Sequence, residues 1–303
     1  RVGIKKYNSY IDMSTLNGND IKQLSKIATK YTVFGRVSPI QKKALIKALQ
    51  ANGKTVAMTG DGVNDVLALK EADCSIAMAG GSDATKNISQ LVLLNSNFSA
   101  MPKIVAEGRR TINNIQRSAS LFLVKTIYSC LLAIIFLFAR EGYPFIPIQL
   151  SLISVITIGI PSFLLALEPN KERIKGNFLR NVISKALPTG LTVAINIVIL
   201  MILNKNHFIP DTYFSSLCVI STGMCGLLLL FTLAKKRKGE NSKLPFSIYR
   251  ITLAIIMAII FTVGLIVFGW FFNIVHITLI SSYIIELFIL SFAIFLILNL
   301  VFS

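Results

Sequence analysis

The chain has 303 residues, of which 53% are hydrophobic and 15% are charged. A typical soluble domain has about 25% charged residues, and the mean hydropathy of +0.67 predicts that a large part of the chain lies in a membrane. This composition excludes intrinsic disorder, a collagen-like fibre and a disulfide-rich scaffold. The formal net charge of +17 indicates either nucleic-acid binding or the basic cytoplasmic loops of a membrane protein.

The first third of the chain has the pattern of an α/β domain. Ser38, followed by Pro39 and Gln41, is typical of a helix N-terminus with a capping box, and this helix is expected to run to about Gln50. The apolar run 55–58 is expected to be a buried parallel strand, because it is short and glycines follow it. The further predicted elements are a helix over 63–72 and strands over 75–78 and 90–94.

Apolar segments of the length that crosses a bilayer begin near residue 118. A polar, basic helix is expected to start near Met101 and to continue into the first of these segments, because no break signal separates them. The chain is therefore predicted to contain a partial cytoplasmic domain over 1–100, a stalk helix over 101–117 and a membrane part over 118–303. The six predicted spans are 118–139, 145–167, 186–203, 213–234, 251–272 and 277–302.

Basic residues alternate between the predicted connections. The connections 168–185 and 235–250 carry 5 and 6 Lys or Arg residues, whereas 140–144, 204–212 and 273–276 carry one, one and none. This pattern predicts that the N-terminal part and the C-terminus are cytoplasmic. It explains most of the excess charge, so we expect no nucleic-acid partner.

One short motif carries chemistry. The stretch Thr59–Asp65 reads TGDGVND, follows a predicted strand and opens a helix, which is where ligands bind in α/β sheets. Asp61 and Asp65 can face one site from a tight turn, and Gly60 and Gly62 allow the backbone to approach a ligand closely. A site with only a small number of carboxylates, whose oxygens are hard ligands, suits Mg²⁺ held between protein and phosphate. Taken alone, an ordinary Asp-Gly turn is the alternative explanation.

The longer string up to Met78 resembles the hinge segment of P-type ATPases, which are cation pumps whose phosphorylation domain has a haloacid dehalogenase-like fold. Other segments resemble further parts of the same family, in the same order. They are RVSP with Gln41-Lys42 (36–42), GRR with Asn113-Asn114 (108–114), IPIQL (146–150) and GIP (159–161). The resemblance implies part of an α/β haloacid dehalogenase-like domain, followed by an all-α bundle of six transmembrane helices, numbers five to ten of the family.

The resemblance also implies roles for individual residues. Asp61 is similar to the aspartate that ligates Mg²⁺, and Asn64 and Asp65 are similar to its partners in ordering the metal and the phosphoryl group. Lys42, which alone would be interpreted as an exposed helix lysine, resembles the lysine that neutralises phosphoryl charge. The implied cofactor is Mg²⁺ and the implied substrate is ATP, with the phosphate loop formed by Thr59, Gly60 and Gly62.

The Asp-Lys-Thr-Gly-Thr string in which pumps of this family are phosphorylated does not occur in the sequence, which begins with Arg1. We therefore expect these residues to belong to a longer pump and to be inactive alone. Its remaining part would carry the actuator and nucleotide-binding domains and helices one to four. Pairing with a separate polypeptide is the alternative.

The ion path is expected in the first two predicted spans. Ser129 stands where calcium pumps of the family carry a glutamate, and Ser154 and Ile158 stand where they carry an asparagine and an aspartate. Thr157 keeps the type found in these pumps. This less polar pattern resembles a bacterial branch of the family that is linked to calcium, and it leaves the ion open.

Polar and helix-breaking groups within the spans are further candidates. Pro161 is expected either to free backbone carbonyls for a cation or to kink the helix. Lys125 either points into the bundle or extends to the cytoplasmic surface. Glu286 is expected to pair with a lysine, bind a cation or serve the structure, and Asn196 to make an interhelical hydrogen bond.

Together these features predict part of an ATP-driven P-type cation pump in the plasma membrane, with Ca²⁺ as one candidate ion. Its partners are the lipid bilayer, the transported cation and the remaining part of the pump. A membrane-anchored phosphatase of the haloacid dehalogenase type is one alternative, although six spans with internal charges exceed what an anchor needs. A lipid-flipping P-type ATPase, consistent with the apolar Ile158, and a non-catalytic partner subunit are the others.

Overall fold

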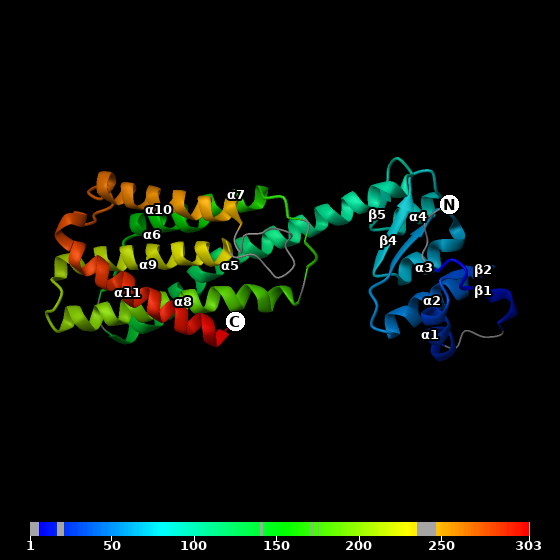
Figure 1. The fold of residues 1–303 in the computed structure, drawn as a ribbon, viewed down its shortest axis with the longest axis horizontal. Helices are drawn as coiled ribbons and strands as arrows, with labels where there is room; N and C mark the ends of the chain where they lie inside the picture. Colours follow the sequence, from blue (N-terminus) through cyan, green and yellow to red (C-terminus); the bar gives the residue numbers. More distant parts are fainter. Residues whose placement is uncertain are drawn as a thin grey trace. The chain divides into compact units, whose positions relative to one another are not determined.

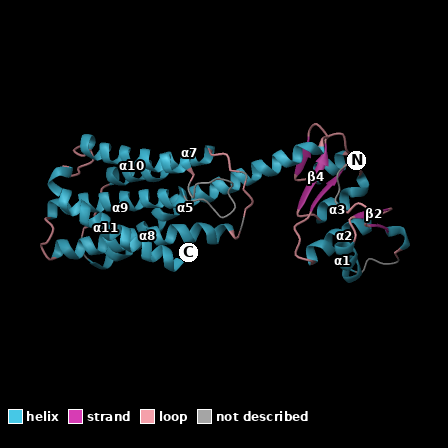
Figure 2. Cartoon of the chain, viewed as in Figure 1, coloured by secondary structure: helices cyan, strands magenta, loops and turns pink. Residues whose placement is uncertain are grey.

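Two units follow each other along the chain, residues 1–104 and 105–303 (Figure 1). The computed structural model describes residues 6–16, 21–139, 142–170, 172–174, 176–234 and 247–302. All strands of the described part lie in the first unit, and the second unit is helical (Figure 2). The predicted fold class, an α/β domain followed by six apolar helices, is therefore confirmed.

The first unit contains short parallel strands and the helices that connect them. The strands form one pair, β1–β2, and one three-stranded sheet in the order β3-β4-β5. Its strands and helices are β1 (Tyr10–Asp12), α1 (Ile21–Lys30), β2 (Val33–Gly35), α2 (Pro39–Ala51), β3 (Ala57–Gly60), α3 (Val66–Glu71), β4 (Cys74–Met78), α4 (Asp83–Ile88) and β5 (Leu91–Leu93). Short 3-10 turns lie at Met13–Thr15, Val63–Asp65 and Phe98–Ala100.

Helix α2 begins where the capping residues predict. The Ser38 hydroxyl accepts a hydrogen bond from the Gln41 amide at 3.3 Å, and the Gln41 side-chain oxygen accepts from the Ser38 amide at 3.0 Å. Gly53, just past the helix, has a φ of +70°, a conformation that glycine adopts without steric penalty. These local interactions fix both ends of α2 and with them the position of Lys42 in its first turn.

Strands β3 and β4 are joined near their beginnings by a side-chain hydrogen bond, and each is followed by a loop at its carboxyl end. They pair in parallel, with Thr59 opposite Ile76. Just before β3, the Val56 amide donates to the Asp73 carboxylate at 2.7 Å, and this hydrogen bond lowers the pKa of Asp73. Because parallel strands end at the same edge of a sheet, the loops after Gly60 and after Met78 become neighbours.

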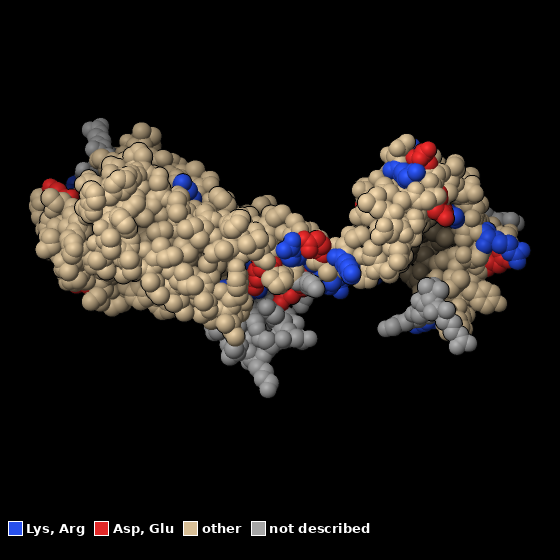
Figure 3. Space-filling model, turned by 90° about the horizontal axis from the view of Figure 1, so that it is seen from above, with Lys and Arg blue, Asp and Glu red and all other residues tan. Residues whose placement is uncertain are grey.

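The second unit is a bundle of long apolar helices. Six helical segments are long and apolar enough to cross a membrane, and in Figure 3 their surface is broad and almost free of charged side chains. The helices are α5 (Met101–Ala139), α6 (Pro147–Ser154), α7 (Ile160–Leu167), α8 (Phe178–Lys205), α9 (Asp211–Ala234), α10 (Ile248–Phe268) and α11 (Ile277–Phe302). A π-helical turn, Val155–Gly159, joins α6 to α7 so that together they make one span.

The helices differ from the predicted spans mainly at their ends. Helix α5 is continuous over 39 residues, and α8 starts eight residues before the predicted span at 186 because Asn177 caps it by accepting from the Leu179 amide. Helix α10 ends at Phe268 rather than 272. The apolar run continues there, but Asn273 adopts a φ of 52° and the chain turns, which hydropathy alone does not reveal.

Burial differs strongly between the helices. In the most apolar 18-residue window of each, 78% of α9 is buried inside the bundle, against 17% of α11. Helix α9 is packed against α8, α10, α11 and the π-helical turn. It is therefore the central helix, whereas α11 presents most of its surface outward.

Candidate functional site

The motif loop lies at the carboxyl edge of the three-stranded sheet. Asp61 directly follows β3, and its carbonyl oxygen accepts a hydrogen bond from the Ser82 amide at 2.8 Å. Ser82 belongs to the loop after β4, which approaches so closely that a Cβ on Gly81 would lie 2.7 Å from the same carbonyl oxygen. The neighbouring loop therefore fixes the backbone that carries the exposed Asp61 side chain.

Asp65 returns toward the end of β3 through the 3-10 turn Val63–Asp65. A Cβ on Gly60 would lie 2.5 Å from the Asp65 Cβ, so only glycine allows this approach. The Asp65 Oδ2 also lies 3.4 Å from the Asp61 amide nitrogen, which donates to it. The turn thus brings the Asp65 carboxylate to the backbone of Asp61, the other carboxylate residue that the sequence predicts for this site.

Lys42 reaches the same place from the first turn of α2. Its Nζ lies 2.7 Å from the Asp65 Oδ1, and the two side chains are 33% and 11% exposed. Thr59 and Gly62 are half-buried, and Asn64 is exposed. The structure therefore clusters Lys42, Asp61 and Asp65, while the catalytic roles of these residues stay predictions.

The donor set of this loop fits Mg²⁺. Among the described residues no three His, Cys, Asp or Glu side chains gather closely enough to hold a metal by themselves. Two carboxylates at the end of a strand suit a cation that keeps water or phosphate oxygens as its other ligands. The Lys42 ammonium adds positive charge beside them, as a phosphoryl group requires.

Within the membrane bundle, Lys125 points toward a neighbouring helix. Its Nζ donates to the Ser154 hydroxyl oxygen at 2.8 Å, and that hydroxyl donates to the Leu150 carbonyl at 2.6 Å. The structure thus favours the inward alternative for Lys125. Two candidate ion-path residues are thereby brought together.

Thr157 lines a small enclosed cavity at the centre of the bundle. Its hydroxyl donates to the Ile153 carbonyl at 2.7 Å, so the oxygen lone pairs stay available as ligands. The cavity has a volume of about 10 Å³ and is also lined by Tyr128 of α5 and Thr222 of α9, which is room for about one water molecule. The Tyr128 hydroxyl is buried and has no hydrogen-bond partner in the described part of the chain.

Tyr128 and Thr222 are candidates that sequence reasoning missed. The family resemblance pointed to the adjacent Ser129, which is half-buried and is not among the residues lining this cavity. Nothing in the sequence singled out Thr222 on α9, because threonine is common in apolar helices. Pro161 is buried just beyond the π-helical turn and cannot donate the amide hydrogen bond that the Thr157 carbonyl would otherwise accept.

A buried ionic cluster joins three helices near the ends of α7 and α10. Glu168 forms ion pairs with Arg117 of α5 and Arg250 of α10, and the Arg250 Nε lies 2.9 Å from both carboxylate oxygens. Asn114 donates to the Glu168 carbonyl at 2.8 Å. Arg250, which the sequence places among loop charges, is therefore a buried partner, whereas the basic run at 235–246 lies outside the described residues.

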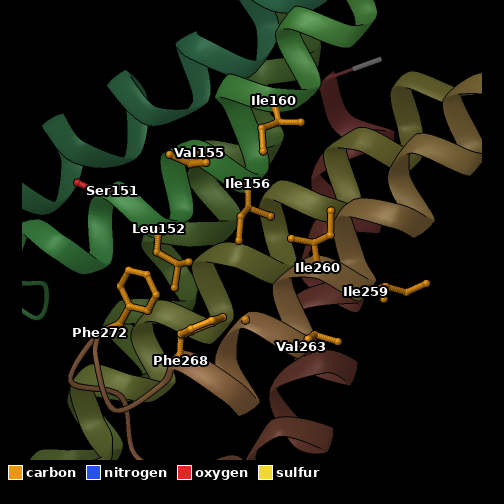
Figure 4. A pocket seen from close by; sticks show the side chains of 11 residues that line it. Ser151, Leu152, Val155, Ile156, Ile160, Ile259, Ile260, Val263, Phe268 and Phe272 are labelled. Atoms are coloured by element: carbon orange, nitrogen blue, oxygen red, sulfur yellow. The ribbon is translucent and has the colours of Figure 1, made fainter.

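An interhelical hydrogen bond and an apolar cavity are two further features of the membrane bundle. Asn196 donates to the Ser291 hydroxyl at 2.8 Å, which confirms the predicted interhelical hydrogen bond. An apolar cavity of about 570 Å³ opens between α6, the π-helical turn and α10, with Val155, Ile156 and Ile260 among its lining side chains (Figure 4). Because Ser151 is its only polar lining residue, this cavity does not suit a cation.

Comparison with known proteins identifies relatives of both units. A family model described as haloacid dehalogenase-like hydrolase matches residues 15–73, which include Lys42, Asp61 and Asp65. The chain is 41% identical to the "Probable cation-transporting ATPase exp7" of Streptococcus pneumoniae, over 84% of this chain and 32% of that protein. It is 49% identical to the "Calcium-transporting ATPase CtpE" of Mycolicibacterium smegmatis, over 57% of this chain and 23% of that protein.

A solved structure, the catalytic domain of the CPx-ATPase CopB-B, is 36% identical over 28% of this chain and 34% of that chain, with a TM-score of 0.23. That score is too low to support a structural comparison. Residues 1–303 thus span about a third of the length of the first relative and about a quarter of the second.

Proposed function

This chain is homologous to cation-transporting P-type ATPases, and we propose that it forms the part of such a pump that links phosphoryl chemistry to the ion path. The observation that carries the proposal is the cluster of Lys42, Asp61 and Asp65. It lies in a haloacid dehalogenase-like unit on the same chain as six apolar helices. We propose ATP as the substrate and an aspartate outside residues 1–303 as the group that is phosphorylated.

The residues of the first unit have separate tasks in this proposal. Asp61 and Asp65 hold Mg²⁺, which supplies positive charge against the phosphoryl oxygens. Lys42 places its ammonium on the same oxygens and, without substrate, keeps Asp65 neutralised through their ion pair. The loop after β4 holds the Asp61 backbone in place through Ser82, so that little rearrangement is needed when substrate binds.

The transported ion is proposed to be a cation such as Ca²⁺, bound near Thr157. The support is the cavity that Tyr128, Thr157 and Thr222 line together with apolar residues, and the lone pairs that the Thr157 hydroxyl keeps free. Ca²⁺ needs six to eight oxygens but accepts neutral ones, so this chain would supply only part of the shell. Ser129, Ser154 and the carbonyls near Pro161 stay candidates for further ligands, and Lys125 for a fixed positive charge beside them.

The proposed orientation places the first unit and the C-terminus in the cytoplasm, in the plasma membrane. Its support is the distribution of basic residues between the connections. The connection that contains His207 then lies outside the cell. A His207→Cys variant should react with a membrane-impermeant thiol reagent added to intact cells, whereas labelling only after lysis would contradict this orientation.

The proposal is tested by Asp61→Asn in the complete protein. Asn keeps the size of the side chain but removes the charge at the metal, so Mg²⁺-dependent ATP hydrolysis should fall at least about 10²-fold, as for other lost transition-state charges. Glu107→Gln, a charge removal at a side chain that is 59% exposed, is the control and should keep normal turnover. Near-normal hydrolysis in Asp61→Asn would refute the assignment.

Stimulation by different ligands separates the alternatives. A cation pump shows ATP hydrolysis that rises with its cation, whereas a flippase responds to a phospholipid and a phosphatase to neither. The measurement therefore uses the complete protein in vesicles with Ca²⁺, Na⁺, K⁺ or added anionic lipid. Stimulation by lipid alone would indicate a flippase instead of a cation pump.

A further inference from the structure

Helix α11 crosses α8 and α9 (Figure 1), and most of its surface is exposed. Seven exposed positions follow each other at alternating steps of three and four residues, which is the spacing with which one helix presents a continuous stripe to another. We call this stripe the outer seam. It consists of Leu279, Ser282, Glu286, Ile289, Ala293, Leu296 and Leu300.

Glu286 is the ionisable residue of this stripe, whose other members are apolar except for Ser282. It lies nine residues after Ile277 and sixteen before Phe302, so it is about 14 Å along the helix from one end and about 24 Å from the other. A glutamate side chain extends only a few ångströms and cannot reach water across such a distance. The carboxylate therefore lies at a depth where lipid chains cannot solvate it.

Two other charged groups of the membrane unit, Lys125 and Glu168, have partners. Lys125 is bonded to Ser154, and Glu168 is paired with Arg117 and Arg250. Glu286, by contrast, has no hydrogen bond or ion pair to any residue that the structure describes. A charge on this carboxylate would therefore need a partner outside this part of the chain.

We propose that the outer seam of α11 is the docking surface for a membrane-spanning helix of another protein, with a lysine or arginine at the depth of Glu286. Charge complementarity selects this occupant, because a basic side chain supplies both the opposite charge and hydrogen-bond donors. The remaining seam residues, apolar except for Ser282, provide a surface for packing along the same helix. A second copy of this chain does not fit, since a two-fold pairing of the seam would bring Glu286 against Glu286.

The test measures association in phosphatidylcholine vesicles between the donor-labelled full chain and an acceptor-labelled designed helix. The probe is a single polyleucine span with one lysine at the depth of Glu286, and the same span without lysine is its control. The lysine probe should bind at least about tenfold more tightly, measured by energy transfer. Glu286→Gln, which keeps the shape and removes the charge, should abolish this difference.

A second variant separates the seam from the charge alone. Ile285 is adjacent in sequence and 63% exposed but lies about 100° around the helix, outside the outer seam. In the double variant Ile285→Glu with Glu286→Gln, preference for the lysine probe should stay lost. Restored binding there, equal binding of both probes to the unaltered chain, or self-association that depends on Glu286 would each overturn the proposal. None of these outcomes depends on ATP hydrolysis, so they are independent of the proposed pump activity.

Discussion

The adjacent glycines Gly80 and Gly81 offer a direct test of how the loop after β4 positions Asp61. A methyl group on Gly81 would lie 2.7 Å from the Asp61 carbonyl oxygen and 3.0 Å from its Cα. A comfortable contact is about 3.5 Å, and both atoms belong to the backbone, so neither can rotate away. On Gly80 the nearest atom is the Ser96 hydroxyl oxygen at 3.5 Å, which is an ordinary contact.

The expected magnitudes follow from these distances. Gly81→Ala should destabilise the loop by about 1–3 kcal/mol, the usual range for overpacking. Gly80→Ala should be neutral or stabilise it by up to about 1 kcal/mol, because alanine restricts the unfolded chain. A displacement of Asp61 by about 1 Å should also reduce turnover by about 10²-fold in the first variant.

The measurement is amide hydrogen exchange at Ser82, whose amide donates to the Asp61 carbonyl. A loss of 1–3 kcal/mol corresponds to exchange that is about 5- to 150-fold faster. Gly81→Ala should show this acceleration, and Gly80→Ala should not. Equal exchange rates in the two variants would show that close approach of the two loops does not hold Asp61 in place.

Three changes in the membrane unit test the remaining assignments. Thr157→Ala should reduce the apparent affinity for the transported cation at least several-fold, measured as cation-stimulated hydrolysis, and an unchanged affinity would move the site elsewhere. Lys125→Ala should change the cation dependence or the charge moved per ATP, because it removes an inward charge; identical behaviour would leave Lys125 a structural residue. Glu168→Gln should destabilise the bundle by about 3–5 kcal/mol, since it leaves two buried arginines without their carboxylate, whereas Glu107→Gln at an exposed pair should change stability by at most about 1 kcal/mol. Denaturation in detergent, followed by fluorescence of the single tryptophan, would contradict this view if both glutamate variants unfolded together.

Much of the first unit follows from residues that are close in sequence. The capping residues Ser38 and Gln41 predict where α2 begins, because the hydrogen bonds that cap a helix join residues three apart. The order of strand, TGDGVND loop and helix is likewise local. This order was enough to predict that Asp61 and Asp65 share a turn. Lys42, in the preceding helix, was predicted as their partner only from the family resemblance.

The existence of six spans was also determined by the sequence, because a bilayer requires about 20 apolar residues in a row. Their ends were less certain, as α10 shows by stopping at Phe268 within a continuing apolar run. Hydropathy reports the free energy of transfer into lipid and carries almost no information about backbone turns. The positive φ of Asn273 therefore has no signature in the pattern.

The partners of the buried polar groups were decided by the tertiary structure alone. Glu168 and Arg250 are 82 residues apart, and nothing in the sequence pairs them, since the arginine equally suits a cytoplasmic loop. The choice between Tyr128 and Ser129 for the central cavity depends on the rotation of α5 against its neighbours, which an apolar pattern leaves poorly defined. Hydropathy determines which segments leave water, whereas side-chain packing between distant helices determines which polar atoms meet, and with them the proposed ion path.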